Sequence, residues 1–336
     1  MTRYLGVDLA WGEGSTTSAA KETGLVCLTA SGEIIAAAWA RGIDAVAEWL
    51  SENAQQGDVI AIDAPLVVNN ESGMRECERE VAQRYGRWKV AANATNRTRP
   101  WQGGVTLRKR LEAKGFVYTS GSPASVEQVT FFECYPYTTL VGAPEFGYDV
   151  ERPRYKRFNN ALMDVAAKRS LRASECDELI RRTALLSTAT PALALESHPN
   201  TEMLVSQRSP LSDVPYKHRE DLLDAALCAW TAALWHQYGD DRCQVLGKGD
   251  VADDDGRVAA IIAPAKPEQR AGARQSKSTT RQALTYSELL AEATKVLIRN
   301  GTRDLDGSTF ALAKTKHLAA LDALEINALS ESGAED

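Results

Sequence analysis

The first 65 residues follow an order of apolar runs that restricts the fold more than any other feature of the chain. Three short strand-like runs come first, and an amphipathic helix follows them, with apolar residues recurring from Ile43 to Leu50. The continuous apolar run at 58–65 comes next, and such a run is typical of a buried parallel strand. The order β-β-β-α-β predicts an α/β fold, in which helices flank a mixed sheet. The three runs are residues 4–10, 24–30 and 32–40.

Acidic residues stand near the ends of three apolar runs. Asp8 lies late in the first run, Asp63 ends the run at 58–65, and Glu133 ends a run within 126–140. The carboxyl ends of parallel strands meet along one edge of a sheet, where ligands usually bind. We therefore expect these acids to lie close together, although a single acid at a strand end also commonly begins a turn.

Two further acids lie on a helix expected at 217–239. Asp221 and Asp224 are three residues apart and so share one face of this helix. Asp221 alone is explained as a solvated acid in the first turn, but Asp224 lies among apolar neighbours. Converged carboxylates repel one another, and a divalent cation with a preference for oxygen ligands, Mg²⁺ or Mn²⁺, removes that conflict.

These patterns define the predicted site. The predicted metal ligands are Asp8, Asp63, Asp221 and Asp224, and the predicted catalytic residues are Asp8, Asp63, Glu133 and Asp224. Two such ions would stabilise the attacking and the leaving oxygen of a phosphodiester. Three other residues are weaker candidates: Glu196 as a substitute for Glu133, His218 as a group that orients a carboxylate or receives a proton, and Cys134 as a nucleophile.

The segment 84–114 is a basic insert in an acidic protein. It contains nine basic residues and one acid, with Tyr85, Trp88 and Trp101 among them, whereas the whole chain carries a net charge of −6. Phosphates are attracted to such a segment, and aromatic side chains can stack on bases. The alternative is a solvated surface whose charges pair with nearby glutamates. The predicted substrate-binding residues are Arg84, Arg87, Lys89, Arg97, Arg99 and Trp101.

A nucleotide site is the main rival interpretation. The segment 8–19 resembles the first phosphate loop of actin-like ATPases and sugar kinases, in which glycine and hydroxyl donors surround the phosphates of ATP. That superfamily normally carries a second glycine-rich loop, which we do not find in this sequence, and the chain has no G-x-x-x-x-G-K-[ST] motif.

The composition excludes several other classes of protein. The six cysteines form no C-x-x-C pair and the four histidines are scattered, which argues against a zinc site. Wide cysteine spacing among apolar neighbours is typical of reduced thiols in a cytoplasmic protein. The N-terminus does not read as a signal peptide, and no apolar stretch is long enough to span a membrane.

The chain is expected to contain three regions. Residues 1–264 form the α/β domain with its basic insert, and 265–285 form a basic linker without apolar periodicity. Residues 286–336 are expected to be a helical C-terminal extension, which docks on the domain, forms a small unit of its own or serves a protein partner.

Four motifs together resemble domain-of-unknown-function family 429. They are YLGVDLAW, VIAIDAPL, FFECYPYTTL and HREDLLDAALCAW, within residues 3–264. Members of the family are described as predicted nucleases with an RNase H-like fold, so the resemblance implies a mixed five-stranded sheet with a β-β-β-α-β core. It also implies metal-binding roles for Asp8 in the first strand, for Asp63 at the end of the fourth, and for Asp224 with Asp221 on the late helix. Glu133 matches the glutamate of the family's Glu-x-x-Pro motif.

The leading hypothesis is a cytoplasmic, metal-dependent nuclease or phosphodiesterase that acts on DNA or RNA with Mg²⁺ or Mn²⁺. The alternatives are an actin-like or sugar-kinase-type enzyme that binds ATP, and an RNase H-like scaffold without catalytic activity. A scaffold would leave Asp8, Asp63 and Asp224 far apart, whereas a metal site requires them to converge.

Overall fold

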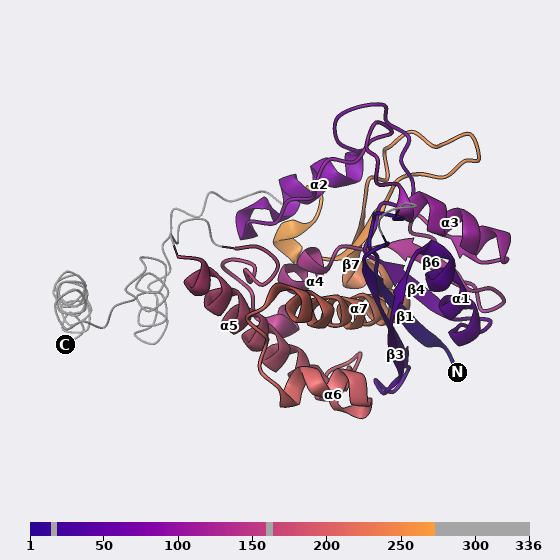
Figure 1. Ribbon diagram of the computed structural model, residues 1–336. Helices are drawn as coiled ribbons and strands as arrows, with labels where there is room; N and C mark the ends of the chain where they lie inside the picture. Colours follow the sequence, from indigo (N-terminus) through magenta and orange to yellow (C-terminus); the bar gives the residue numbers. More distant parts are fainter. Residues whose placement is uncertain (15–18, 159–163, 273–336) are drawn as a thin grey trace, which may run out of the picture. The chain divides into compact units, whose positions relative to one another are not determined.

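A mixed α/β fold with an eight-stranded sheet and seven α-helices is seen in the computed structural model, which describes residues 1–14, 19–158 and 164–272 (Figure 1). Residues 1–156 and 173–272 belong to one compact unit, which contains the sheet and the site discussed below. The strands are β1 (Arg3–Asp8), β2 (Glu22–Thr29), β3 (Ile34–Arg41), β4 (Val59–Ile62), β5 (Val117–Tyr118), β6 (Thr130–Glu133), β7 (Cys243–Leu246) and β8 (Ile261–Pro264). The helices are α1 (Ile43–Asn53), α2 (Glu76–Tyr85), α3 (Gly103–Ala113), α4 (Pro136–Gly142), α5 (Val165–Ala184), α6 (Pro199–Ser206) and α7 (Asp213–Tyr238).

The sheet has the strand order β3-β2-β1-β4-β6-β8-β7, and β5 pairs with β6. The first three strands are antiparallel, whereas β1, β4, β6 and β8 are parallel neighbours. The predicted order β-β-β-α-β is confirmed. The sheet has three strands more than the five we expected, because β5, β7 and β8 add short pieces of two, four and four residues.

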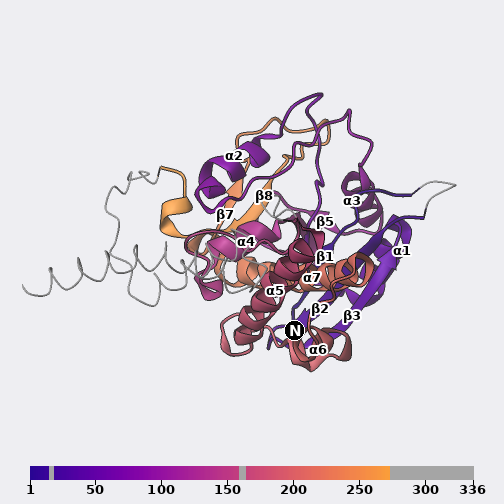
Figure 2. The same ribbon diagram turned by 60° about the vertical axis from the view of Figure 1, so that its left-hand side comes forward.

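The two faces of the sheet are covered by different helices (Figures 1 and 2). Alternate residues of a strand point to opposite faces. Leu5 and Val7 of β1 therefore pack with α1 and α3, whereas Tyr4 packs on the side of α7. Every residue of α7 from Arg219 to Trp235 is buried, so this helix is enclosed by the sheet on one side and by other helices elsewhere.

The remaining predictions of chain organisation have mixed outcomes. The sequence also predicts two helices near 156–168 and 174–187. The structure has one helix there, α5, and residues 159–163 lie outside the described part of the chain. Of the predicted linker at 265–285 only residues up to 272 are described, and the predicted extension at 286–336 lies outside the described residues. None of the described helices has the length and the apolar character needed to cross a membrane.

Candidate functional site

Asp8 and Asp63 lie next to each other at the ends of two parallel strands. Val7 pairs with Ile62 in the β1–β4 ladder, and the backbone N–H of Asp63 donates to the carbonyl of Val7 at 2.8 Å. The residue that follows each member of this pair points to the face covered by α7. Both carboxylates are nearly buried, with exposed fractions of 7% for Asp8 and 9% for Asp63.

Helix α7 brings its acids to the same place because two strand glycines leave room for its backbone. A Cβ atom added to Gly6 would lie 2.0 Å from the carbonyl oxygen of Ala225, and one added to Gly24 would lie 2.0 Å from that of Asp221. A larger residue at either position would push the helix away. The close approach lets Asp221 form a side-chain hydrogen bond with Asp8. Asp224 is fully buried one turn further along.

Two lysines contact these carboxylates. The Lys156 Nζ lies 2.6 Å from Asp224 Oδ2 and 3.5 Å from Asp63 Oδ2. The Lys217 Nζ, on the first turns of α7, lies 2.6 Å from Asp221 Oδ1 and 3.8 Å from Asp8 Oδ2. Lys217 also contacts a fifth acid, Glu220, at 2.9 Å. The carboxylate cluster, as we call Asp8, Asp63, Glu220, Asp221 and Asp224 together, thus holds five acids and two ammonium groups.

Burial and mutual repulsion raise the pKa values of the acids. Loss of solvation raises the pKa of Asp63 to about 8, and the charges of Asp8 and Asp224 add to it against the opposing charge of Lys156. Loss of solvation, with the charge of Asp8, raises the pKa of Asp221 to about 9. Burial likewise raises the pKa of Asp224 and brings that of Glu220 to about 7. Full ionisation of the five acids would exceed the charge of the two lysines, so some of the acids hold protons at neutral pH in the absence of a further cation.

The chemistry of the donors fits a divalent cation that prefers oxygen ligands. All five acids offer carboxylate oxygens, which Mg²⁺ and Mn²⁺ favour. Asp224 Oδ2 is buried, and its contact among the described residues is the ion pair with the Lys156 ammonium at 2.6 Å. The side chains are not, however, already arranged as a coordination sphere: in the described part of the chain no three His, Cys, Asp or Glu residues are placed to hold a metal ion. The ammonium groups of Lys156 and Lys217 lie between the carboxylates instead.

Glu133 does not join the cluster. It pairs with Ile62 in the β4–β6 ladder, so the residue level with Asp63 is Cys134, and Glu133 points to the opposite face from Cys134. Its two carboxylate oxygens accept hydrogen bonds from Arg75 at 2.6 and 2.8 Å, and one also accepts from the backbone of Leu66 at 3.0 Å.

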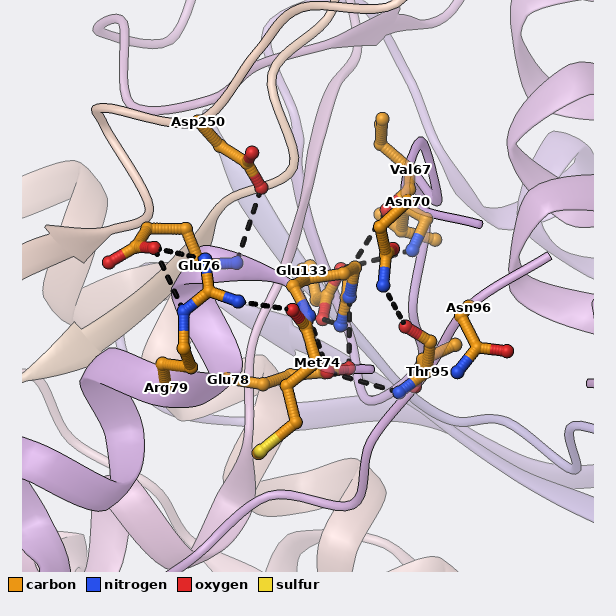
Figure 3. Close-up of polar contacts among 12 residues, drawn as sticks. Val67, Asn70, Met74, Glu76, Glu78, Arg79, Thr95, Asn96, Glu133 and Asp250 are labelled. Atoms are coloured by element: carbon orange, nitrogen blue, oxygen red, sulfur yellow. Dashed lines mark hydrogen bonds and ion pairs between the residues drawn. The ribbon is translucent and has the colours of Figure 1, made fainter. Parts of the chain in front are cut away.

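Glu78 completes this buried network on the other side of the guanidinium. It lies close to Glu133, binds the Nε of Arg75 and accepts from the backbone N–H of Thr95 (Figure 3). The network ties the end of β6 to α2 and to the loops on either side of that helix. We therefore assign Glu133 a structural role in holding these loops.

A cavity of about 40 Å³ lies between the two groups of acids. Its walls include Asp63 and Glu133, together with Trp11, Asn93 and Tyr135. A polar cavity of this size has room for a water molecule. The catalytic role predicted for Glu133 stays a prediction, and this cavity is the place where Glu133 would hold a water molecule.

The basic insert divides into a structural part and an exposed part. Arg84 binds the side chains of Glu80 and Gln244, and both Tyr85 and Trp88 are buried, with their polar atoms bonded to backbone carbonyls. The exposed predicted residues are Arg87, Lys89, Arg97, Arg99 and Trp101. Arg97 is paired with Glu71.

Trp101 is the exposed residue that the structure ties to the site most directly. It is 54% exposed and lies beside Gly12. The backbone N–H of Gly103 donates to the carbonyl of Trp11, and the Trp11 indole donates to the carbonyl of Asp63. The segment that carries Trp101 is therefore connected to Asp63 through Trp11.

The weaker candidates are placed apart from the cluster or inside the core. Glu196 is exposed near the start of β3, at the opposite end of the strands from Asp8. His218 stacks on Trp39 and contacts Glu22 at 2.8 Å. Cys134 is buried, with its sulfur 3.4 Å from that of Cys228. Residues 15–18 of the suggested phosphate loop lie outside the described part of the chain.

Sequence reasoning missed Lys156, Lys217 and Glu220. Lys217 is four residues before Asp221 on the predicted helix, so the helical spacing could have revealed this pair. Glu220 lies in the same turn. Lys156 comes from an irregular segment far from the strands in sequence, and no local pattern indicates its position.

One family model matches this chain over residues 6–250, and its description reads "Protein of unknown function (DUF429)". The chain belongs to this family. The match includes all the acids of the cluster and both lysines, which confirms the resemblance drawn from the four motifs. No curated protein and no solved structure matches the chain.

Proposed function

We propose that this DUF429 protein is a metal-dependent phosphodiesterase that cleaves nucleic acid at the carboxylate cluster. The observation that supports the proposal is the convergence of Asp8, Asp63 and Asp224 from two strands and one helix at the carboxyl edge of parallel strands. A scaffold without catalytic activity has no need of this convergence, because repulsion among buried acids lowers stability.

The topology supports an RNase H-like assignment within the broader α/β class. Three antiparallel strands, a helix and a fourth strand parallel to β1 make up the core that the family resemblance implies. In our proposal the short strands β5, β7 and β8 are additions to that core. A fold alone does not determine an activity, so the proposed activity rests on the arrangement of the acids and not on the topology.

Asp8, Asp63, Asp221 and Asp224 are the residues that would hold Mg²⁺ or Mn²⁺. Such an ion supplies neutralisation of phosphate charge and activation of water. The side chains around it have separate tasks. Asp221, with its pKa raised to about 9, holds a proton at neutral pH until a cation displaces it. Lys217 is 52% exposed and offers a positive charge to a phosphate at the edge of the cluster.

Nucleic acid would reach the cluster along the exposed part of the basic insert. Trp101 offers a surface for base stacking, and Arg97 and Arg99 beside it offer positive charge to the backbone. Arg84 is not part of this surface, since both of its contacts are internal. The proposed substrate is a nucleic acid with an accessible single-stranded region, since an unpaired base is what Trp101 would bind.

The test is cleavage of structured DNA and RNA substrates in Mn²⁺ or Mg²⁺ by the full-length protein. We expect activity that EDTA abolishes and that Asp8→Asn and Asp63→Asn each reduce by about 100-fold or more, because each removes a charged ligand. Asp44→Asn is the matched control, since Asp44 is exposed and pairs only with Arg110 in the described contacts. Equal cleavage by the wild type and Asp8→Asn, or no cleavage of any nucleic acid, would reject the proposal.

A further inference from the structure

Lys156 enters the carboxylate cluster from outside the elements that carry the acids. It belongs to the segment between α4 and α5, yet its ammonium contacts Asp224 and Asp63 at once. Its side chain is 19% exposed, and its Nζ also lies 5.5 Å from the ring centre of Tyr137. The ammonium therefore occupies a position between two of the proposed metal ligands.

The backbone on one side of Lys156 is firmly held. The neighbouring Tyr155 is buried, its hydroxyl donates to Asp224 Oδ1 at 2.6 Å, and its carbonyl accepts from the Tyr216 hydroxyl at 2.6 Å. Earlier in the segment, the backbone N–H of Arg152 donates to Trp88 and its Nε donates to Lys89. A lysine side chain is long and flexible. The ammonium can thus leave Asp63 and Asp224 while Tyr155 stays in place.

The carboxylate oxygens of Asp63 and Asp224 cannot bind the Lys156 ammonium and a divalent metal ion at the same time. Asp224 Oδ2 is buried, and it is the closer of the two acids' oxygens to the Lys156 ammonium. A divalent ion that binds this oxygen and Asp63 takes the position of the ammonium and repels it. Lys217 differs, since it is half exposed and contacts Asp221 and Glu220 from the solvent side.

We propose that Lys156 is a built-in counter-cation that competes with the divalent metal ion for Asp63 and Asp224. Binding of the metal ion and binding of the Lys156 ammonium to these carboxylates then weaken each other by the same factor. Lys156 sets the metal concentration at which the site fills. The identity of the competing ion rests on the proposed function, whereas the competition itself concerns the contacts of Lys156.

Calorimetric titration of the full-length protein with Mn²⁺ tests the competition. We expect Lys156→Met to bind Mn²⁺ about 10-fold more tightly or better, within the usual range of couplings between sites. Lys248→Met is the matched control, because Lys248 is exposed and lies 3.9 Å from Asp240, outside the cluster. It removes the same charge and is expected to bind Mn²⁺ as the wild type does.

The wild-type protein provides a second measurement that does not depend on the folding of a variant. Acylation of lysines by an N-hydroxysuccinimide ester, read by mass spectrometry, should be slow at Lys156 in EDTA and several-fold faster in saturating Mn²⁺. Lys248 should react at the same rate in both conditions. An unchanged or slower rate at Lys156 in Mn²⁺ would overturn the inference.

The outcomes separate this inference from the proposed function. Equal Mn²⁺ affinity of the wild type and Lys156→Met, in a protein that still cleaves nucleic acid, overturns the competition alone. Cleavage that fails while Lys156→Met binds Mn²⁺ more tightly overturns the nuclease proposal and supports the competition. If neither the wild type nor any variant binds Mn²⁺, both the competition and the proposed function are rejected.

Discussion

Asp8 and Asp63 lie side by side because the residues before them, Val7 and Ile62, are partners in the parallel β1–β4 ladder. Their carboxylates point to the face that α7 covers, and the burial that results raises the pKa of Asp63 to about 8. An acid in this position is costly for folding in the absence of a bound cation. Asp58 is fully buried but has favourable partners. Its carboxylate accepts hydrogen bonds from the side chain and the backbone of Arg3 and from the backbone N–H of Gln55.

Asp63→Asn should stabilise the metal-free protein, whereas Asp58→Asn should destabilise it. Asparagine at position 63 removes a charge that burial disfavours, and we expect the free energy of unfolding at pH 8 in EDTA to rise by about 1–3 kcal/mol. At position 58 the same change removes an ion pair, and a loss of about 1–3 kcal/mol is expected. Urea denaturation measures both. A destabilised Asp63→Asn protein would contradict the strain that we infer in the cluster.

The stability of the metal-free protein should fall as the pH rises. Asp63 and Asp221 have folded-state pKa values of about 8 and about 9, well above the ordinary value of 3.8 for an aspartate. The folded protein therefore binds more protons than the unfolded chain, and the free energy of unfolding declines from about pH 4 to about pH 9. Each group contributes a slope of up to about 1.4 kcal/mol per pH unit.

Denaturation in EDTA at pH 5, 7 and 9 measures this decline. Asp221→Asn should show a shallower slope, because one of the titrating acids is gone. Addition of Mg²⁺ should flatten the slope further, since a bound cation replaces the protons. A free energy of unfolding that does not change over this range would show that these acids do not titrate as described.

Much of the site could be predicted from local patterns in the sequence. Asp8 and Asp63 each end an apolar run, and Asp221 and Asp224 share a helical face, so a parallel sheet with a covering helix brings them together. Glu133 has the same local pattern and does not join them. Its position depends on the register of β6 against β4, and a shift of one residue turns a side chain to the other face.

Contacts made by irregular segments could not be predicted in this way. Lys156 is placed by the anchoring of Tyr155 and Arg152 to distant parts of the chain, and neither anchor follows a helical or strand period. The basic insert shows a similar limit. Its composition predicted a positive surface, but only the tertiary contacts separate the internal Arg84 from the exposed Arg99.

Gly6→Ala should displace α7 and with it three of the five acids of the carboxylate cluster. A Cβ at this position would lie 2.0 Å from the carbonyl oxygen of Ala225 and 2.3 Å from the N of Ala229, both of which are backbone atoms. We expect a loss of about 3 kcal/mol or more in the free energy of unfolding, at the upper end for an overpacked core. Mn²⁺ affinity should also fall, since Asp221 and Asp224 move with the helix.

Gly86→Ala is the control for this change. Gly86 has a helical backbone conformation, and an added Cβ would meet no atom within 4 Å. Alanine there is expected to be neutral or slightly stabilising. Thermal and urea unfolding of the two variants, with Mn²⁺ titration of each, give the comparison. A Gly6→Ala protein that keeps wild-type stability and metal affinity would contradict the close packing of α7 on β1.

Arg75→Met should be far more damaging than Arg79→Met, although each arginine pairs with a glutamate three residues away. Arg75 is buried between Glu78 and Glu133, at 2.9 and 2.6 Å, and its loss leaves two buried carboxylates without their partner. Removal of one member of a buried ion pair typically costs about 3–5 kcal/mol. Arg79 is half exposed beside Glu76, and its loss should have little effect on stability because solvent screens an exposed ion pair.

A double variant tests the structural role of the Glu133 network. If Arg75 only holds the loops around α2, a second change that removes the uncompensated charge should restore part of the lost stability. We therefore expect the double variant Arg75→Met, Glu133→Gln to be more stable than Arg75→Met alone, by about 1–3 kcal/mol. Thermal unfolding of the single and double variants measures this difference. A double variant less stable than Arg75→Met would contradict the view that Glu133 is left as an uncompensated buried charge when Arg75 is removed.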